Sequence, residues 1–142
     1  MASKAHDHCQ VSATVNRLLA RADSELGAAV STDDPDDQFL HAHLAALRTA
    51  AAVVELRGRP GPRSGARTVW EMLNKVAPEL GLWSVYFASG SRERSAIESG
   101  LGVEPARAAE LIACAEDFRD EVAMLIDPNV TFNHQRHLAA VS

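Results

Sequence analysis

Apolar residues recur at every third or fourth position along four long segments of the chain, which is the spacing of amphipathic helices. The four segments are residues 10–30, 35–57, 68–87 and 105–126. No segment of useful length alternates apolar and polar residues like a strand, and no Asn-Gly hairpin turn occurs. The pattern predicts an all-α fold: an antiparallel bundle of four to five helices with short connections.

Local signals predict where these helices begin and end. Pro35 and Pro105 suit the first turn of a helix, where the missing N–H costs nothing. Gly58 is the kind of residue that closes a helix. Thr68 is followed three positions later by Glu71, which is the capping-box pattern of a helix start.

Two stretches leave the helix pattern less defined. The apolar stripe of residues 68–87 crosses Pro78, so either the helix kinks there or a new helix starts with Pro78 in its first turn. Residues 88–103, ASGSRERSAIESGLGV, contain three glycines and are predicted to be a connection in which one helical turn forms around residues 94–97. The side chains expected to be buried, in the monomer or across a dimer interface, are Trp70, Leu73, Leu80, Phe118 and Leu44.

A chain of 142 residues has the length of one ordinary domain. We assign residues 10–127 to the helical bundle, residues 1–9 to a flexible N-terminal tail and residues 128–142 to a loosely ordered C-terminal tail. No apolar run approaches the roughly 18 residues of a membrane span, and the N-terminus lacks the apolar core of a signal peptide. The expected location is the cytoplasm, with no membrane partner.

Charge is unevenly distributed along the chain. The net charge is −5, yet residues 48–94 hold eight basic and four acidic residues. Four of these arginines fall in one stretch rich in glycine and proline, RGRPGPRSGAR, which predicts an exposed loop. A basic island in an acidic chain favours contact with phosphate groups or an acidic partner. The predicted binding residues are Arg48, Arg57, Arg59, Arg63, Arg67, Arg92 and Arg94.

Known catalytic motifs are absent from the sequence. There is no phosphate-binding glycine loop, no His-Glu-x-x-His, no Cys-x-x-Cys and no Gly-x-Ser-x-Gly. The six histidines fall in pairs that do not make a metal site, so neither a metal nor a cofactor is predicted. His41 and Arg48 are seven residues apart and share a helix face, which makes them weak candidates for acid–base chemistry.

Two segments carry a resemblance to a known family. FLHAHLAALRTAAAVVELRGRP and TVWEMLNKVAPELGLWSVYFASGSRERSAIESG resemble a small group of actinobacterial proteins in the HEPN superfamily, named for higher eukaryotes and prokaryotes nucleotide-binding. The likeness covers about residues 11–126. It implies a bundle of four or five helices that usually pairs into a dimer. It also implies a link to RNA, because many members are metal-independent ribonucleases and others only bind.

The ribonuclease motif of the superfamily does not carry over to this sequence. Active members have an arginine, a polar residue, and a histidine four to six positions after the arginine, late in the chain. Here the late arginines are Arg107 and Arg119, and no histidine stands at that distance from either. An enzyme is therefore not favoured.

Three functions remain to be compared. The leading hypothesis is a non-catalytic dimeric module whose basic loop contacts nucleic acid (RNA or single-stranded DNA), a nucleotide phosphate or an acidic protein. The first alternative is a metal-independent ribonuclease with a rearranged site, and the second is a protein–protein scaffold.

Overall fold

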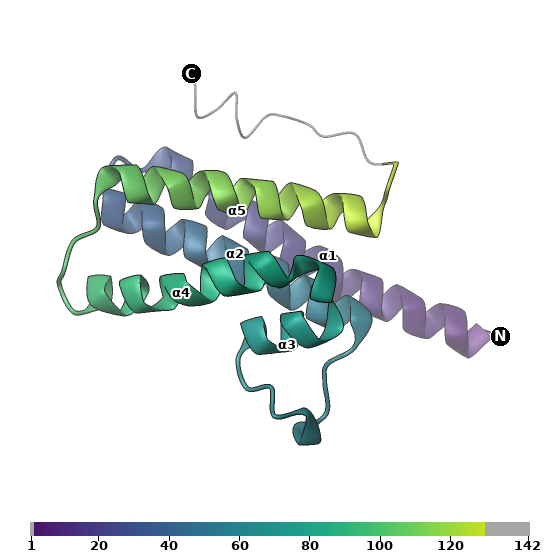
Figure 1. Cartoon of the computed structure of the whole chain (residues 1–142). Helices are drawn as coiled ribbons and strands as arrows, with labels where there is room; N and C mark the ends of the chain where they lie inside the picture. The colour runs from purple at the N-terminus through teal and green to yellow at the C-terminus, as the bar shows by residue number, and fades with distance from the viewer. Residues whose placement is uncertain (1, 130–142) are drawn as a thin grey trace.

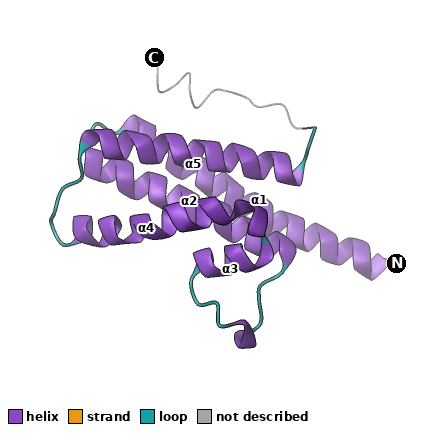
Figure 2. Ribbon diagram, in the orientation of Figure 1, coloured by secondary structure: helices purple, strands orange, loops and turns teal. Residues whose placement is uncertain are grey.

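The structure is a computed structural model that describes the backbone of residues 2–129 and the side chains of residues 13–129. Five α-helices follow one another with no strand in this described range, which confirms the predicted all-α fold (Figures 1 and 2). The helices are α1 (Ala2–Ser31), α2 (Pro35–Arg57), α3 (Val69–Val76), α4 (Gly81–Glu98) and α5 (Pro105–Ile126), and two short 3-10 turns cover Pro62–Ser64 and Pro78–Leu80.

Helix α2 is the centre of the bundle. It packs against α1, α3, α4 and α5, with α1 and α2 forming an antiparallel hairpin and α4 and α5 running in opposite directions (Figure 1). By length and composition alone α2 is apolar enough to cross a membrane. Its enclosure by four helices accounts for that composition, since a core helix has apolar residues on several sides.

The predicted helix ends agree with the structure where a local signal sets them. Helices α2 and α5 both begin on the expected proline. The Thr68 hydroxyl caps α3 by accepting a hydrogen bond from the Glu71 N–H at 3.1 Å. Gly58 closes α2 with a φ of +96°, and its N–H donates to the Val54 carbonyl at 2.9 Å.

Proline 78 starts a new helical segment rather than kinking an existing one. Helix α3 ends at Val76, the 3-10 turn begins at Pro78, and α4 follows from Gly81. Helix α1 begins at Ala2, earlier than the predicted start at Gln10. Once nucleated, a helix extends at modest cost per residue, and residues 2–9 contain no glycine or proline to stop it. The predicted C-terminal tail lies largely outside the described residues.

The prediction of a connection over residues 88–103 is wrong for most of its length. Helix α4 continues through Gly90 to Glu98. A Cβ atom at Gly90 would lie 3.4 Å from Cδ2 of His43 on α2, so this glycine lets the two helices approach closely. Glycine inside a helix costs roughly 0.5–1 kcal/mol, and here the helix is retained because it packs against α2 over this turn.

The core is built around stacked aromatic rings from four helices. Phe87 lies 5.4 Å from Trp70 and 5.3 Å from Phe118 between ring centroids. The predicted core residues Trp70, Leu73, Leu80 and Phe118 are all buried. Leu44 is only half-buried in the monomer. The most enclosed positions of α2 are instead alanines with Phe39 and Val53, because small side chains let neighbouring helices come close.

Candidate functional site

Residues 58–68 form a loop that projects from the bundle between α2 and α3 (Figure 1). Within it Arg59, Arg63 and Arg67 are exposed. The Arg59 guanidinium lies 3.9 Å from the Glu55 carboxylate, a contact at the limit of an ion pair between exposed groups. In the described part of the chain, the side chains of Arg63 and Arg67 form no ion pair with an acid. We call Arg59, Arg63 and Arg67 the basic loop.

Arg57 is held in a structural role that the sequence did not reveal. Its two terminal nitrogens donate to both carboxylate oxygens of Glu79, at 2.9 and 2.6 Å, and one of them also donates to the Val76 carbonyl at 3.0 Å. The hydrogen bonds from Arg57 lower the pKa of Glu79. Arg57 therefore ties the end of α2 to the turn between α3 and α4, and its charge is already partnered.

A groove of about 380 Å³ separates α3 from α4, and most of its surface is apolar. Helices α3 and α4 form its walls and run antiparallel. Trp70 near the start of α3 stacks on Phe87 of α4, while the Asn74 side chain further along α3 lies against Gly81 at the start of α4. The lining residues are Thr68, Trp70, Glu71, Asn74, Ser84, Val85, Ala88 and Ser91.

One end of this groove is basic. Thr68 and Ser91 line the same end, because the start of α3 lies against the later part of α4. Arg67 and Arg92 are their immediate neighbours in the chain, and both are exposed. Arg94 differs, because its Nε donates to Glu98 at 3.2 Å. Arg67 and Arg92 are thus adjacent in the chain to residues that line this end of the groove.

Arg48 does not belong to this basic end. It precedes Arg57 by nine residues on α2, which corresponds to roughly 13.5 Å and half a turn away around the helix. It is half-buried, and its Nε has no hydrogen-bond partner among the described atoms.

The two histidines of α2 have separate surroundings. His41 Nδ1 lies 2.7 Å from a carboxylate oxygen of Glu25 on α1, so one ring nitrogen of this candidate acid–base residue is engaged in a hydrogen bond between the two helices. His43 is buried in the core, with Nε2 3.2 Å from the Phe87 carbonyl. Burial lowers the pKa of His43, which keeps the ring neutral near neutral pH.

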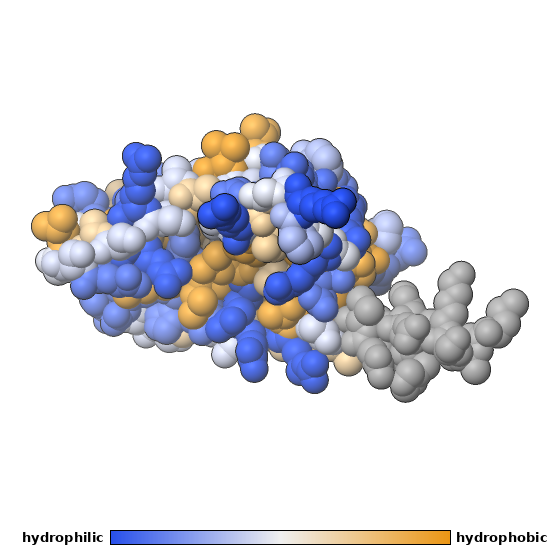
Figure 3. Space-filling model, turned by 90° about the horizontal axis from the view of Figure 1, so that it is seen from below, coloured by the Kyte–Doolittle hydropathy of each residue, from blue (hydrophilic) through white to orange (hydrophobic). Residues whose placement is uncertain are grey.

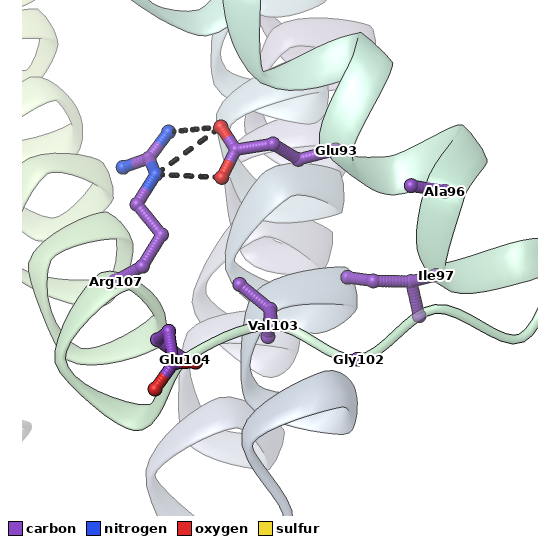
Figure 4. Close-up of a pocket in the computed structure, with 7 residues that line it drawn as sticks. All are labelled: Glu93, Ala96, Ile97, Gly102, Val103, Glu104 and Arg107. Carbon is purple, nitrogen blue, oxygen red and sulfur yellow. Dashed lines mark hydrogen bonds and ion pairs between the residues drawn. The ribbon is translucent and has the colours of Figure 1, made fainter.

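An arginine that the charge pattern did not single out joins three helices. Arg107 on α5 donates to both carboxylate oxygens of Glu93 on α4, at distances of 2.8 to 3.2 Å, beside a cavity of about 250 Å³ (Figure 4). Its guanidinium also donates to the Tyr86 hydroxyl at 2.7 Å and lies 5.5 Å from the ring centre of Phe39 on α2. The hydrogen bonds to Glu93 raise the pKa of Arg107. Arg107 thus links α5 to Glu93 and Tyr86 of α4 and to Phe39 of α2.

The second late arginine also forms an ion pair with another helix. Arg119 donates to both carboxylate oxygens of Asp23 on α1, at 3.0 and 3.2 Å. Both late arginines therefore fasten α5 to other helices. Among the described residues no group of three or more His, Cys, Asp or Glu side chains is arranged to hold a metal.

The comparisons with known proteins identify the family. The family model for SAV_6107-like HEPN domains matches residues 29–123, which is more than half of the chain. No curated protein and no solved structure matches. The matched range contains all of α2, α3 and α4, and with them the basic loop and the groove. The chain therefore belongs to the SAV_6107-like HEPN family.

Proposed function

We propose that this HEPN domain is a non-catalytic, dimeric, cytoplasmic binding module whose basic loop contacts an anionic partner. The partner would be nucleic acid, a nucleotide phosphate or an acidic protein surface. The observation that carries the proposal is that Arg63, Arg67 and Arg92 are exposed and form no ion pair with another described residue, while Arg67 and Arg92 adjoin in the chain Thr68 and Ser91 of the α3–α4 groove. Arginine fits this purpose because its planar fork donates two parallel hydrogen bonds to a phosphate or a carboxylate.

The arrangement of the other cationic groups supports binding without catalysis. Arg107 and Arg119, the late arginines that could stand for the ribonuclease arginine, donate to Glu93 and Asp23 and have no histidine at the motif distance. His41, the remaining acid–base candidate, is bound to Glu25. A general acid or base has to reach the proton that it transfers, and His41 instead links α2 to α1.

Binding at the basic loop is expected to be weak and strongly dependent on salt. A local positive potential attracts an anion even when the whole chain is acidic, and exposed charges are screened over about 10 Å at 0.1 M salt. For nucleic acid, each phosphate neutralised adds roughly 0.7–0.9 to the slope of log affinity against log salt.

Changing Arg63 and Arg67 together to alanine should lower this slope by about one to two and weaken binding to all nucleic-acid sequences to a similar extent. The measurement is fluorescence anisotropy with labelled single-stranded RNA and single-stranded DNA, and with labelled polyglutamate as an acidic polypeptide, at three salt concentrations. The matched control is the double change Arg17→Ala and Arg21→Ala. It removes the same charge from exposed positions of α1, a helix that packs on α2 and α5. Equal loss in both double variants, or no binding by the wild type at low salt, would reject the basic loop as the site.

The proposed homodimer predicts a mass of twice 15.3 kDa in solution. It is supported by exposed apolar side chains at the end of α5, namely Met124 and Ile126, since apolar patches often mark association surfaces. Light scattering at tens of micromolar should show the dimer, because an interface of standard size persists at that concentration. A single species of monomer mass would contradict this part of the proposal.

A further inference from the structure

Helix α4 exposes two large apolar side chains to solvent, Val85 in the groove and Leu82 beside it. Leu82 is 89% exposed and Val85 is 71% exposed, the two highest values among the large apolar residues described. Val85, Ala88 and Arg92 follow at intervals of three and four residues, so they share one helix face. Figure 3 shows apolar residues gathered among polar ones on the face seen from below. The basic end of the groove therefore continues directly into an apolar surface.

This combination fits a protein better than a nucleic acid. A phosphate backbone gains nothing from Leu82 and Val85, whereas single-stranded nucleic acid is usually held by bases stacked on aromatic rings. Neither tryptophan offers an open ring for that purpose. Trp70 is 5% exposed, and both Trp70 and Trp83 are stacked on Phe87 with centroids 5.4 and 5.7 Å away.

The groove is also shaped for an extended partner. It is shallow and open along its length, unlike the enclosed cavities that bury most of a small ligand. A channel between two packed helices accepts the side chains of a third helix, with anchors at intervals of three and four residues. From Val85 to Arg92 is seven residues, or roughly 10 Å along the helix axis, which two turns of a bound helix would cover.

We infer that the α3–α4 groove binds an amphipathic helix of a partner protein whose first turn is acidic. This inference rests on the proposed function and names its anionic partner. The apolar face of the bound helix covers Val85 and Ala88 of the groove and extends over the exposed Leu82 beside it. Its carboxylates meet the exposed Arg67 and Arg92.

Charge also sets the direction of the bound helix. Acidic residues stabilise the first turn of a helix, where the backbone N–H groups leave partial positive charge. The acidic first turn lies at the Arg92 end of α4, so the bound helix runs antiparallel to α4. On the α3 wall, Glu71 already accepts a hydrogen bond from the Arg67 N–H at 3.0 Å. The bound helix therefore places its carboxylates away from Glu71 and toward Arg92 and the basic loop.

The test uses a labelled helix-forming peptide with an Asp-Glu first turn and leucines at every third and fourth position. The full-length protein should bind it, and a peptide with the acidic residues moved to its last turn should bind more weakly. The double variant Leu82→Ser and Val85→Ser should weaken binding about tenfold or more, because it removes two apolar anchors without changing charge. Leu101→Ser, an exposed leucine outside the groove, is the matched control and should leave the affinity unchanged.

The outcomes separate this inference from the proposed function. If polyanions bind through Arg63 and Arg67 but the peptide does not, the helix site is rejected and the proposed function stands. If neither binds, both fail. If the Leu82→Ser and Val85→Ser variant loses RNA binding to the same extent as peptide binding, the groove is a nucleic-acid site and the inference is rejected. It is equally rejected if that variant turns a dimer into a monomer in light scattering, since a second copy would then cover the groove.

Discussion

Replacing Phe87 by alanine should lower the free energy of unfolding by about 3–5 kcal/mol. The Phe87 ring is fully buried and lies between the rings of Trp70, Trp83 and Phe118. Deleting it removes a ring that contacts both α3 and α5, and it leaves a void that these large rings cannot fill by small shifts. Because domains are stable by only about 5–15 kcal/mol, such a loss should move the midpoint of a urea melt strongly.

The matched control for this change is Phe87→Leu, which keeps most of the apolar volume and should cost less than about 1.5 kcal/mol. Tryptophan fluorescence and circular dichroism should report the same transition for the wild type and for both variants. A loss below about 1 kcal/mol for Phe87→Ala would show that the aromatic cluster is not the centre of the core.

The sequence predicted helix ends well wherever the signal lies within a few residues. Pro35, Pro105 and the pair Thr68 and Glu71 act through local backbone hydrogen bonds, and the structure places each helix start where these residues predict it. At Pro78 the sequence allowed either a kinked helix or the start of a new helix. The structure selects a new helical segment, since the chain needs to turn there for α3 and α4 to pack side by side.

Gly90 shows why the later part of α4 was missed. In a single sequence, glycines at 90, 100 and 102 with serines between them are typical of a loop. The role of Gly90 depends on His43, which is distant in sequence and lies against it in the fold. A contact between two helices makes this glycine favourable, and no pattern within α4 itself encodes that contact.

The sequence predicted where the arginines of the candidate site collect, but not which of them pair with acidic residues. The number of arginines between residues 48 and 94 is visible in the sequence. Which of these arginines form ion pairs depends on acidic residues that are distant in the sequence, as with Arg57 and Glu79. Arg107 was not selected as a binding residue, yet it makes the most extensive set of contacts of any described arginine. Its neighbour Glu93 precedes it by fourteen residues, beyond the reach of helix periodicity.

Replacing Arg107 by methionine should cost about 2 kcal/mol of unfolding free energy. Methionine keeps much of the apolar stem, but it leaves the Glu93 carboxylate without its charged partner and the Tyr86 hydroxyl without a donor. Breaking one side of a buried ion pair costs about 3–5 kcal/mol. This pair is only partly buried, since the Arg107 side chain is 21% exposed and that of Glu93 is 38% exposed, and screening by solvent brings the expected loss below that range. Arg107→Lys should recover little, since an ammonium group cannot donate in parallel to both carboxylate oxygens or stack on Phe39.

Removing both charges should be less harmful than removing one. In Arg107→Met combined with Glu93→Gln, no unpaired carboxylate is left near the interior, so the double variant should be more stable than Arg107→Met alone. Urea melts of the wild type, the two single variants and the double variant form a double-mutant cycle, which measures the coupling free energy between the two side chains. A coupling near zero would mean that Arg107 stabilises the bundle through its packing on Phe39 and Tyr86 alone. A large coupling would locate the stabilisation in the ion pair that fastens α5 to α4 and so holds one wall of the α3–α4 groove in place.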